Sequence, residues 1–130
     1  MKRLLDTNAY VALKRNHPAV VDLVRSSTEL VLSVVVVAEL LFGFRNGARY
    51  ERNVKELDEL IASPRVSVLA ATRTTADRFG RIAAALRRAG TPIPSNDIWI
   101  AAQTFESGAE LLTFDAHFAA VDGLVYTHLS

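Results

Sequence analysis

The chain has 130 residues, which suffice for one hydrophobic core but not for two, so we expect a single domain over residues 1–130. It has no cysteine, which excludes disulfides, thiolate metal sites and cysteine nucleophiles, and its three histidines form no i,i+4 pair of the kind that binds zinc. The formal net charge of +1 excludes a whole-molecule electrostatic field strong enough to drive nucleic-acid binding.

Short apolar segments alternate with longer segments of helical periodicity along the whole chain. The predicted strands span 3–6, 29–33, 66–69, 110–113 and 124–127, and the predicted helices span 8–15, 18–26, 34–46, 49–62, 73–89 and 97–107. Gly90 is expected to end the helix over 73–89. Such alternation is typical of an α/β fold with a central parallel sheet covered by helices.

The apolar segments are too short for a membrane protein. The longest run, residues 30–44, cannot span a bilayer and contains a glutamate. The N-terminus, which reads "MKRLLD", has two apolar residues before a carboxylate and so does not resemble a signal peptide. We therefore expect a cytoplasmic protein with no membrane contact.

Three aspartates lie where a predicted strand or loop leads into a helix. Asp6 follows the first strand in "LLDTN", Asp97 opens a helix in "IPSNDIWIAA", and Asp115 follows a later strand in "LLTFDAHF". In parallel α/β sheets, ligands bind outside the carboxyl ends of the strands, so the three carboxylates are expected to converge there. Each aspartate could instead be a helix N-cap, which needs no shared location.

Glu39 is the one charged residue in the run 30–44. Its neighbours at 34–38 and 40–42 are apolar nearly all round, so we expect this helix to be largely buried. A buried carboxylate without a partner costs several kcal/mol, and a nearby cation removes that cost. The alternative is that Glu39 lies on a solvent-facing strip of the helix.

Carboxylates without cysteine or paired histidine form a set of hard oxygen ligands. Such a set suits Mg²⁺ or Mn²⁺ better than zinc or copper. Magnesium keeps several waters and commonly acts through phosphates, which indicates chemistry on phosphate esters. The chain contains no P-loop and no G-x-G-x-x-G motif that would support another kind of site.

With these residues in place, the sequence resembles the PIN-domain nucleases, and within them the VapC-type toxins of toxin–antitoxin pairs. The resemblance covers essentially the whole chain and rests on "LLDTNAYVAL", "LSVVVVAELLFG", "IPSNDIWIAA" and "LLTFDAHF". It implies a three-layer α/β/α domain, an acidic pocket holding Mg²⁺ or Mn²⁺, and ribonuclease activity on single-stranded RNA. It also implies a homodimer inhibited by a small VapB-type antitoxin, and the apolar excess of the sequence is compatible with such interfaces.

The resemblance also implies roles for particular residues. Asp6 and Asp97 correspond to direct metal ligands, Asp115 to a residue that completes the cluster, and Glu39 to a ligand acting directly or through water. The supporting positions that orient these carboxylates are Thr7, Asn8, Ser33 and Thr113. Ser33 could equally be the N-cap of its own helix.

Four arginines are candidates for contacts with RNA phosphates. These are Arg45, Arg49, Arg87 and Arg88. The alternative for each of them is an ordinary solvated helix surface.

Two other functions each need a residue that this chain lacks, and a third remains open at the level of sequence. A haloacid-dehalogenase-type phosphatase needs a second aspartate two residues after the first, where this chain has Asn8. A receiver-type signalling domain needs a lysine after a late strand, and no lysine follows Lys55. A PIN-like module that binds RNA or a partner without catalysis is a further alternative.

Overall fold

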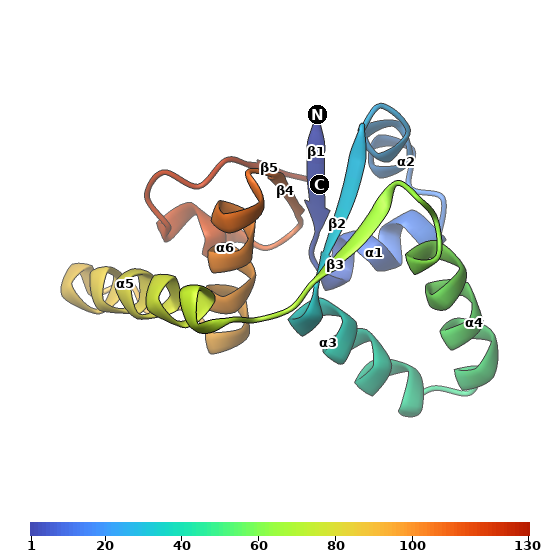
Figure 1. The fold of residues 1–130 in the computed structure, drawn as a ribbon, viewed down its shortest axis with the longest axis horizontal. Helices are drawn as coiled ribbons and strands as arrows, with labels where there is room; N and C mark the ends of the chain where they lie inside the picture. Colours follow the sequence, from blue (N-terminus) through green and yellow to red (C-terminus); the bar gives the residue numbers. More distant parts are fainter.

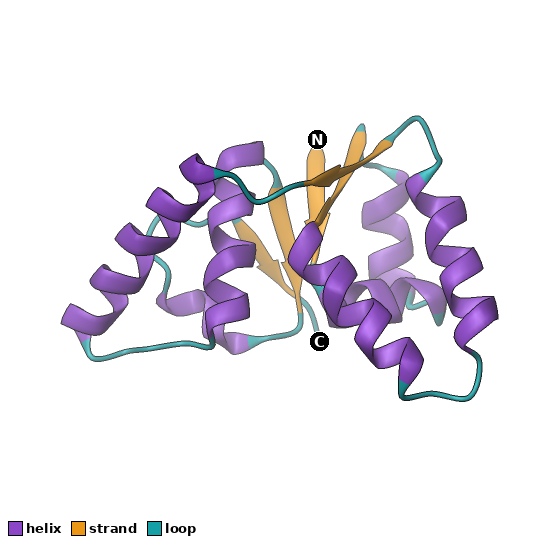
Figure 2. Ribbon diagram, turned by 60° about the horizontal axis from the view of Figure 1, so that its bottom comes forward, coloured by secondary structure: helices purple, strands orange, loops and turns teal.

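The computed structural model describes residues 1–130 as a five-stranded parallel sheet with helices on both faces (Figures 1 and 2). The strands are β1 (Lys2–Leu5), β2 (Glu29–Ser33), β3 (Val66–Leu69), β4 (Glu110–Thr113) and β5 (Tyr126–His128). The helices are α1 (Thr7–Lys14), α2 (Pro18–Arg25), α3 (Val34–Arg45), α4 (Tyr50–Ile61), α5 (Arg73–Ala89), α6 (Ser95–Ser107) and the 3₁₀ helix η1 (Ala116–Ala120). The predicted three-layer α/β/α architecture is confirmed.

The strand order β3-β2-β1-β4-β5 places the first strand at the centre. The chain runs outward from β1 to β3 through α1 to α4, which cover one face of the sheet, and returns through α5 and α6 on the other face (Figures 1 and 2). The order therefore reverses between β1 and β4. In open parallel sheets this reversal opens a crevice at the carboxyl ends of the strands, where ligands bind.

The core explains why the central strands are continuous apolar runs in the sequence. Leu4, Leu5, Leu111 and Leu112, from the two strands on either side of the crevice, are fully buried. Strands covered by helices on both faces have no polar face to alternate with an apolar one. None of the helices is both long and apolar enough to cross a bilayer.

Helix α3 is less buried than its sequence predicts. Only Val36 and Leu40 are buried, whereas Phe42 is 70% exposed and Ala38 is also exposed. The prediction that this helix is largely buried was therefore wrong, because only one stripe of it meets the neighbouring elements. The central buried helix is instead α6, with a continuous buried segment over residues 100–104.

The ends of the elements show smaller differences. Helix α6 begins at Ser95, so Asp97 lies inside its first turn, and the last strand is Tyr126–His128 rather than 124–127. Helix η1 was not predicted. Gly90 ends α5 as predicted, with a left-handed φ of 72° that suits glycine.

Candidate active site

Four carboxylates lie at the carboxyl ends of β1 and β4, where the strand order reverses. Asp6 directly follows β1, and Asp115 lies between β4 and η1. Asp97 lies in the first turn of α6, and Glu39 lies in α3, which contacts both α1 and α6. These side chains come from four parts of the sequence. Hydrogen bonds of neighbouring residues, such as Thr113 and His117, connect the aspartates to one another.

Asp6 is the most enclosed of the four, with 6% of its surface exposed. Its Oδ1 accepts a hydrogen bond of 2.8 Å from the backbone N–H of Ala9, and its Oδ2 accepts one from the hydroxyl of Thr113. Burial raises the pKa of Asp6 above its ordinary 3.8, and the charges of Asp115 and Asp97 raise it further, whereas the two hydrogen bonds lower it. Asp6 is thus both the N-cap of α1 and part of the acidic cluster.

Thr113 connects two of the aspartates. It is the last residue of β4 and is fully buried. Its hydroxyl donates to Asp6 and accepts a hydrogen bond of 2.9 Å from the backbone N–H of Asp115. The side chain therefore fixes the end of β4 against the end of β1.

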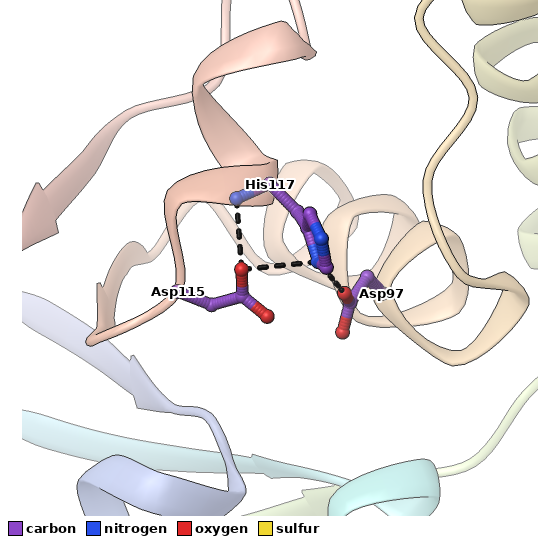
Figure 3. A group of neighbouring side chains, drawn as sticks. All are labelled: Asp97, Asp115 and His117. Atoms are coloured by element: carbon purple, nitrogen blue, oxygen red, sulfur yellow. Dashed lines mark hydrogen bonds and ion pairs between the residues drawn. The ribbon is translucent and has the colours of Figure 1, made fainter.

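Asp97 and Asp115 meet at His117, whose ring lies between them (Figure 3). The Nδ1 of His117 is 3.1 Å from Oδ2 of Asp97 and 3.0 Å from Oδ1 of Asp115. Burial and the charges of Asp115 and Glu39 raise the pKa of Asp97, whereas the hydrogen bond with His117 lowers it. That hydrogen bond and the charge of Asp115 in turn raise the pKa of His117 above 6.5.

Glu39 is half-buried and held from two directions. Its Oε1 accepts a hydrogen bond of 2.6 Å from the hydroxyl of Thr7, and its Oε2 accepts one of 3.3 Å from the side-chain amide of Asn96. Its charge contributes to the raised pKa of Asp97. Glu39 therefore belongs to the same electrostatic cluster as the three aspartates, with neighbours on α1 and α6 fixing its position.

The supporting positions predicted from the sequence behave differently from one another. Thr7 orients Glu39 rather than Asp6, and Asn8 is exposed beside Arg15 in a separate hollow. Asp6 is itself the N-cap of α1, so neither of these two side chains supplies that cap. Ser33 is buried and caps α3 by accepting a hydrogen bond of 3.0 Å from the N–H of Val35.

Two residues of the site were not predicted. His117 follows Asp115 by two positions, and η1 begins between them, so a tight turn after β4 brings the ring back to the carboxylates. The spacing Asp-x-His after a strand was the available signal. Asn96 precedes Asp97 in the sequence but hydrogen bonds Glu39, a contact between residues 57 positions apart.

The four candidate arginines lie outside the acidic cluster. Arg45 stacks on the ring of Tyr50 at 4.5 Å, and Arg49 lines a cavity of about 460 Å³ between α1 and α4, together with Lys14, Arg15 and Arg52. Arg87 and Arg88 lie in the exposed last turn of α5. None of these four arginines forms an ion pair with a carboxylate of the cluster, whose ion-pair partner is His117.

The donor set fits a divalent cation. One oxygen each from Asp97 and Asp115 and one nitrogen from His117 lie within 4.8 Å of one another. The buried Asp6 lies close enough for its pKa to be raised by the charges of both aspartates. Carboxylates whose ionised forms are unfavourable in the free protein gain most from a bound cation, and carboxylate oxygen is the ligand that Mg²⁺ and Mn²⁺ prefer.

Comparison with known proteins matches residues 3–124 to the family described as PIN domain. Ribonuclease VapC1 of Haemophilus influenzae is 32% identical over 114 residues, which cover 85% of this chain and 84% of that protein. The tRNA(fMet)-specific endonuclease VapC of Salmonella typhimurium is 28% identical over 118 residues, covering 87% and 86%. The structure of VapBC-1 from nontypeable H. influenzae superposes with a TM-score of 0.85 at 29% identity, covering 98% of both chains. The chain therefore belongs to the PIN domain family.

Proposed function

We propose that this single-domain chain is a cytoplasmic endoribonuclease that depends on Mg²⁺ or Mn²⁺ and acts as the toxin of a VapBC-like toxin–antitoxin pair. The observation that carries the proposal is the electrostatic cluster of Asp6, Glu39, Asp97 and Asp115 at the reversal of strand order. The relatives named as ribonuclease VapC1 and tRNA(fMet)-specific endonuclease VapC support RNA as the substrate.

In this proposal the carboxylates of Asp6, Asp97 and Asp115 bind the cation. Glu39 binds it either directly or through a water molecule. When bound, the cation supplies positive charge that stabilises the phosphate in the transition state and lowers the pKa of a coordinated water. The remaining chemistry belongs to the side chains of the protein. Thr113 keeps the carboxylate of Asp6 pointed into the site, because its hydroxyl is anchored between the two strand ends.

Glu39 is suited to orient the attacking water. Thr7 and Asn96 each donate to one of its carboxylate oxygens, so the carboxylate is fixed and its other lone pairs remain available to accept a hydrogen bond. A water held there by Glu39 can lose a proton to the carboxylate as its oxygen bonds to the phosphorus; the bond from phosphorus to the leaving ribose oxygen then breaks, and that oxygen takes a proton from solvent. The RNA strand brings further phosphates, which Arg49 and other basic groups around the cavity beside α1 and α4 can contact.

The toxin role rests on the relatives and on exposed apolar surface. The matched VapBC-1 structure is that of a VapBC pair, and we propose a VapB-type antitoxin as the partner of this chain. Phe42 on α3 is 70% exposed, and Val68 on the edge strand β3 is 37% exposed. Apolar side chains of this size are suited to burial in a homodimer or under the antitoxin.

The test of the catalytic proposal is cleavage of total cellular RNA by the purified protein. We expect cleavage with Mg²⁺ or Mn²⁺, none with EDTA, and none with Asp6→Asn or Asp97→Asn in either metal. Asp58→Asn, on the exposed face of α4, serves as the matched control and should cut like the wild type. Cleavage that persists in EDTA, or full activity of both site variants, would contradict the mechanism. RNA binding without cleavage by the wild type would favour the catalytically silent module.

The toxin role needs a separate test. Expression of this chain alone should arrest growth, and expression of Asp97→Asn should not. A small open reading frame beside the gene should encode a protein that restores growth when co-expressed. Harmless expression of an RNA-cleaving wild type would leave the nuclease in place and contradict the toxin role.

A further inference from the structure

We propose that His117 is a nitrogen ligand of the divalent cation at this site and makes the site prefer Mn²⁺ over Mg²⁺. The inference rests on the proposed function, because it concerns the same acidic cluster. It assigns a role to the histidine beside the four carboxylates and identifies the cation that the chain selects.

The spacing of the nitrogen and oxygen atoms is that of ligands on one metal ion. The Nδ1 of His117 lies 3.1 Å from Oδ2 of Asp97 and 3.0 Å from Oδ1 of Asp115 (Figure 3). Neighbouring ligands of an octahedral ion with bonds of about 2.1 Å are about 3 Å apart. The nitrogen therefore already lies at the separation of an adjacent corner from each of the two oxygens, and all three atoms lie within 4.8 Å of one another.

The backbone holds the ring of His117 beside the two carboxylates. The backbone N–H of His117 donates a hydrogen bond of 2.8 Å to Oδ1 of Asp115, which is the N-cap contact of η1. The backbone thereby fixes the start of the side chain beside the carboxylate. The His117 side chain is 50% exposed, so the ring contributes little to a hydrophobic core. Its ring contacts are with the two carboxylates, which are the expected neighbours of a metal ligand.

Only one ring nitrogen of His117, Nδ1, faces the carboxylates. In the neutral tautomer with its proton on Nε2, the lone pair of Nδ1 points between Asp97 and Asp115. That tautomer makes Nδ1 a donor to a cation placed between the two aspartates. The protein then offers one imidazole nitrogen together with carboxylate oxygens.

This mixed donor set discriminates between the two ions. Mg²⁺ prefers oxygen ligands, whereas imidazole suits transition-metal ions, and Mn²⁺ accepts both kinds. Removal of the nitrogen should therefore weaken Mn²⁺ binding much more than Mg²⁺ binding. If His117 only braced the carboxylates through hydrogen bonds, its loss would weaken both ions equally.

Binding and spectroscopy of the full-length protein test the inference without using activity. Electron spin-echo spectroscopy of bound Mn²⁺ should show coupling to an imidazole ¹⁴N in the wild type and none in His117→Ala. Calorimetric titration should show at least about a tenfold loss of Mn²⁺ affinity in this variant and less than about a twofold loss for Mg²⁺. His117→Gln, which can still hydrogen bond the carboxylates, should behave like His117→Ala.

His17→Asn is the matched control. His17 caps α2, as asparagine can, and its ring packs on Phe114 rather than on the carboxylates, so the nitrogen coupling should survive. Bound Mn²⁺ without nitrogen coupling, or equal losses for the two ions, would overturn the role of His117 and leave the proposed nuclease intact. Failure of the wild type to bind either ion would overturn both proposals.

Discussion

Replacement of Thr113 by valine tests how the site is supported. The side chain is fully buried, and its hydroxyl connects Asp6 to the backbone N–H of Asp115. Valine keeps the shape but removes the hydroxyl. Both hydrogen bonds are then lost, and an oxygen of the buried Asp6 carboxylate loses its donor.

The expected cost follows from these two contacts. A hydrogen bond to a charged group contributes about 1.5–3 kcal/mol, and an ordinary one contributes about 1 kcal/mol. The N–H of Asp115 can recover a hydrogen bond from water because this residue is partly exposed. We therefore expect Thr113→Val to lower the free energy of unfolding of the metal-free protein by about 2 kcal/mol, most of it from the charged contact. We also expect Mn²⁺ affinity to fall by at least about tenfold, as is typical when a group that orients a metal ligand is lost.

Urea unfolding in EDTA measures the free energy of unfolding of the metal-free protein. Fluorescence of the single tryptophan is a suitable signal, because Trp99 of α6 packs on Phe79 of α5, with 4.4 Å between the ring centroids. Titration calorimetry measures the affinity for Mn²⁺. Thr113→Ser is the control: it loses a buried methyl group, worth about 1 kcal/mol, but should keep the wild-type affinity. Wild-type affinity in Thr113→Val, or equal losses in both variants, would refute the reasoning.

Three further predictions concern stability. Without metal, Asp6→Asn should unfold at a higher urea concentration than the wild type near pH 7, because a pKa raised above 3.8 makes the ionised carboxylate unfavourable in the folded state. This gain in stability should vanish as the pH falls to about 3.8, where the carboxyl group becomes protonated in both states. A gain in stability that is constant with pH would contradict this cause. Burial raises the pKa of Glu110, but hydrogen bonds from Arg3 and Thr127 and the charge of Arg3 lower it, and on balance the pKa lies below 4.5. Glu110 therefore adds to the free energy of unfolding above pH 4.5, and this contribution is lost as the pH falls through the folded-state pKa. Glu110→Gln should cost about 1–2 kcal/mol at pH 7 and nothing at the lowest pH, measured by urea unfolding at each pH. Gly90→Ala should cost about 1 kcal/mol in thermal unfolding, since the left-handed φ of 72° disfavours a side chain although nothing lies within 4 Å of the added Cβ; an unchanged midpoint would show that the backbone relaxes there.

The sequence predicts the order and type of the elements well, for a physical reason. Strands of a parallel sheet covered on both faces are short apolar runs, and the helices between them carry an amphipathic period. Each junction between them is then visible as a change of pattern. The aspartates that follow the strands could be located for the same reason, because Asp6 comes immediately after β1 and Asp115 comes two residues after the end of β4.

The remaining features depend on tertiary contacts that a linear pattern does not contain. The apolar residues of α3 suggested burial, but only its contacts decide that Phe42 is exposed while Leu40 is buried. Asn96 and Glu39 are far apart in sequence and meet only because α6 approaches α3. His117 joins the site through a single 3₁₀ turn, which is too short to show a helical period in the sequence.

The most direct test of the account is anomalous diffraction from crystals of this protein grown with Mn²⁺. The central claim is that one divalent cation lies among Asp6, Asp97 and Asp115, at the carboxyl ends of β1 and β4. We predict an anomalous peak at that position in the wild type and none in Asp97→Asn. A fully occupied Mn²⁺ elsewhere, with the carboxylates of the wild type bonded only to protein groups, would contradict the claim.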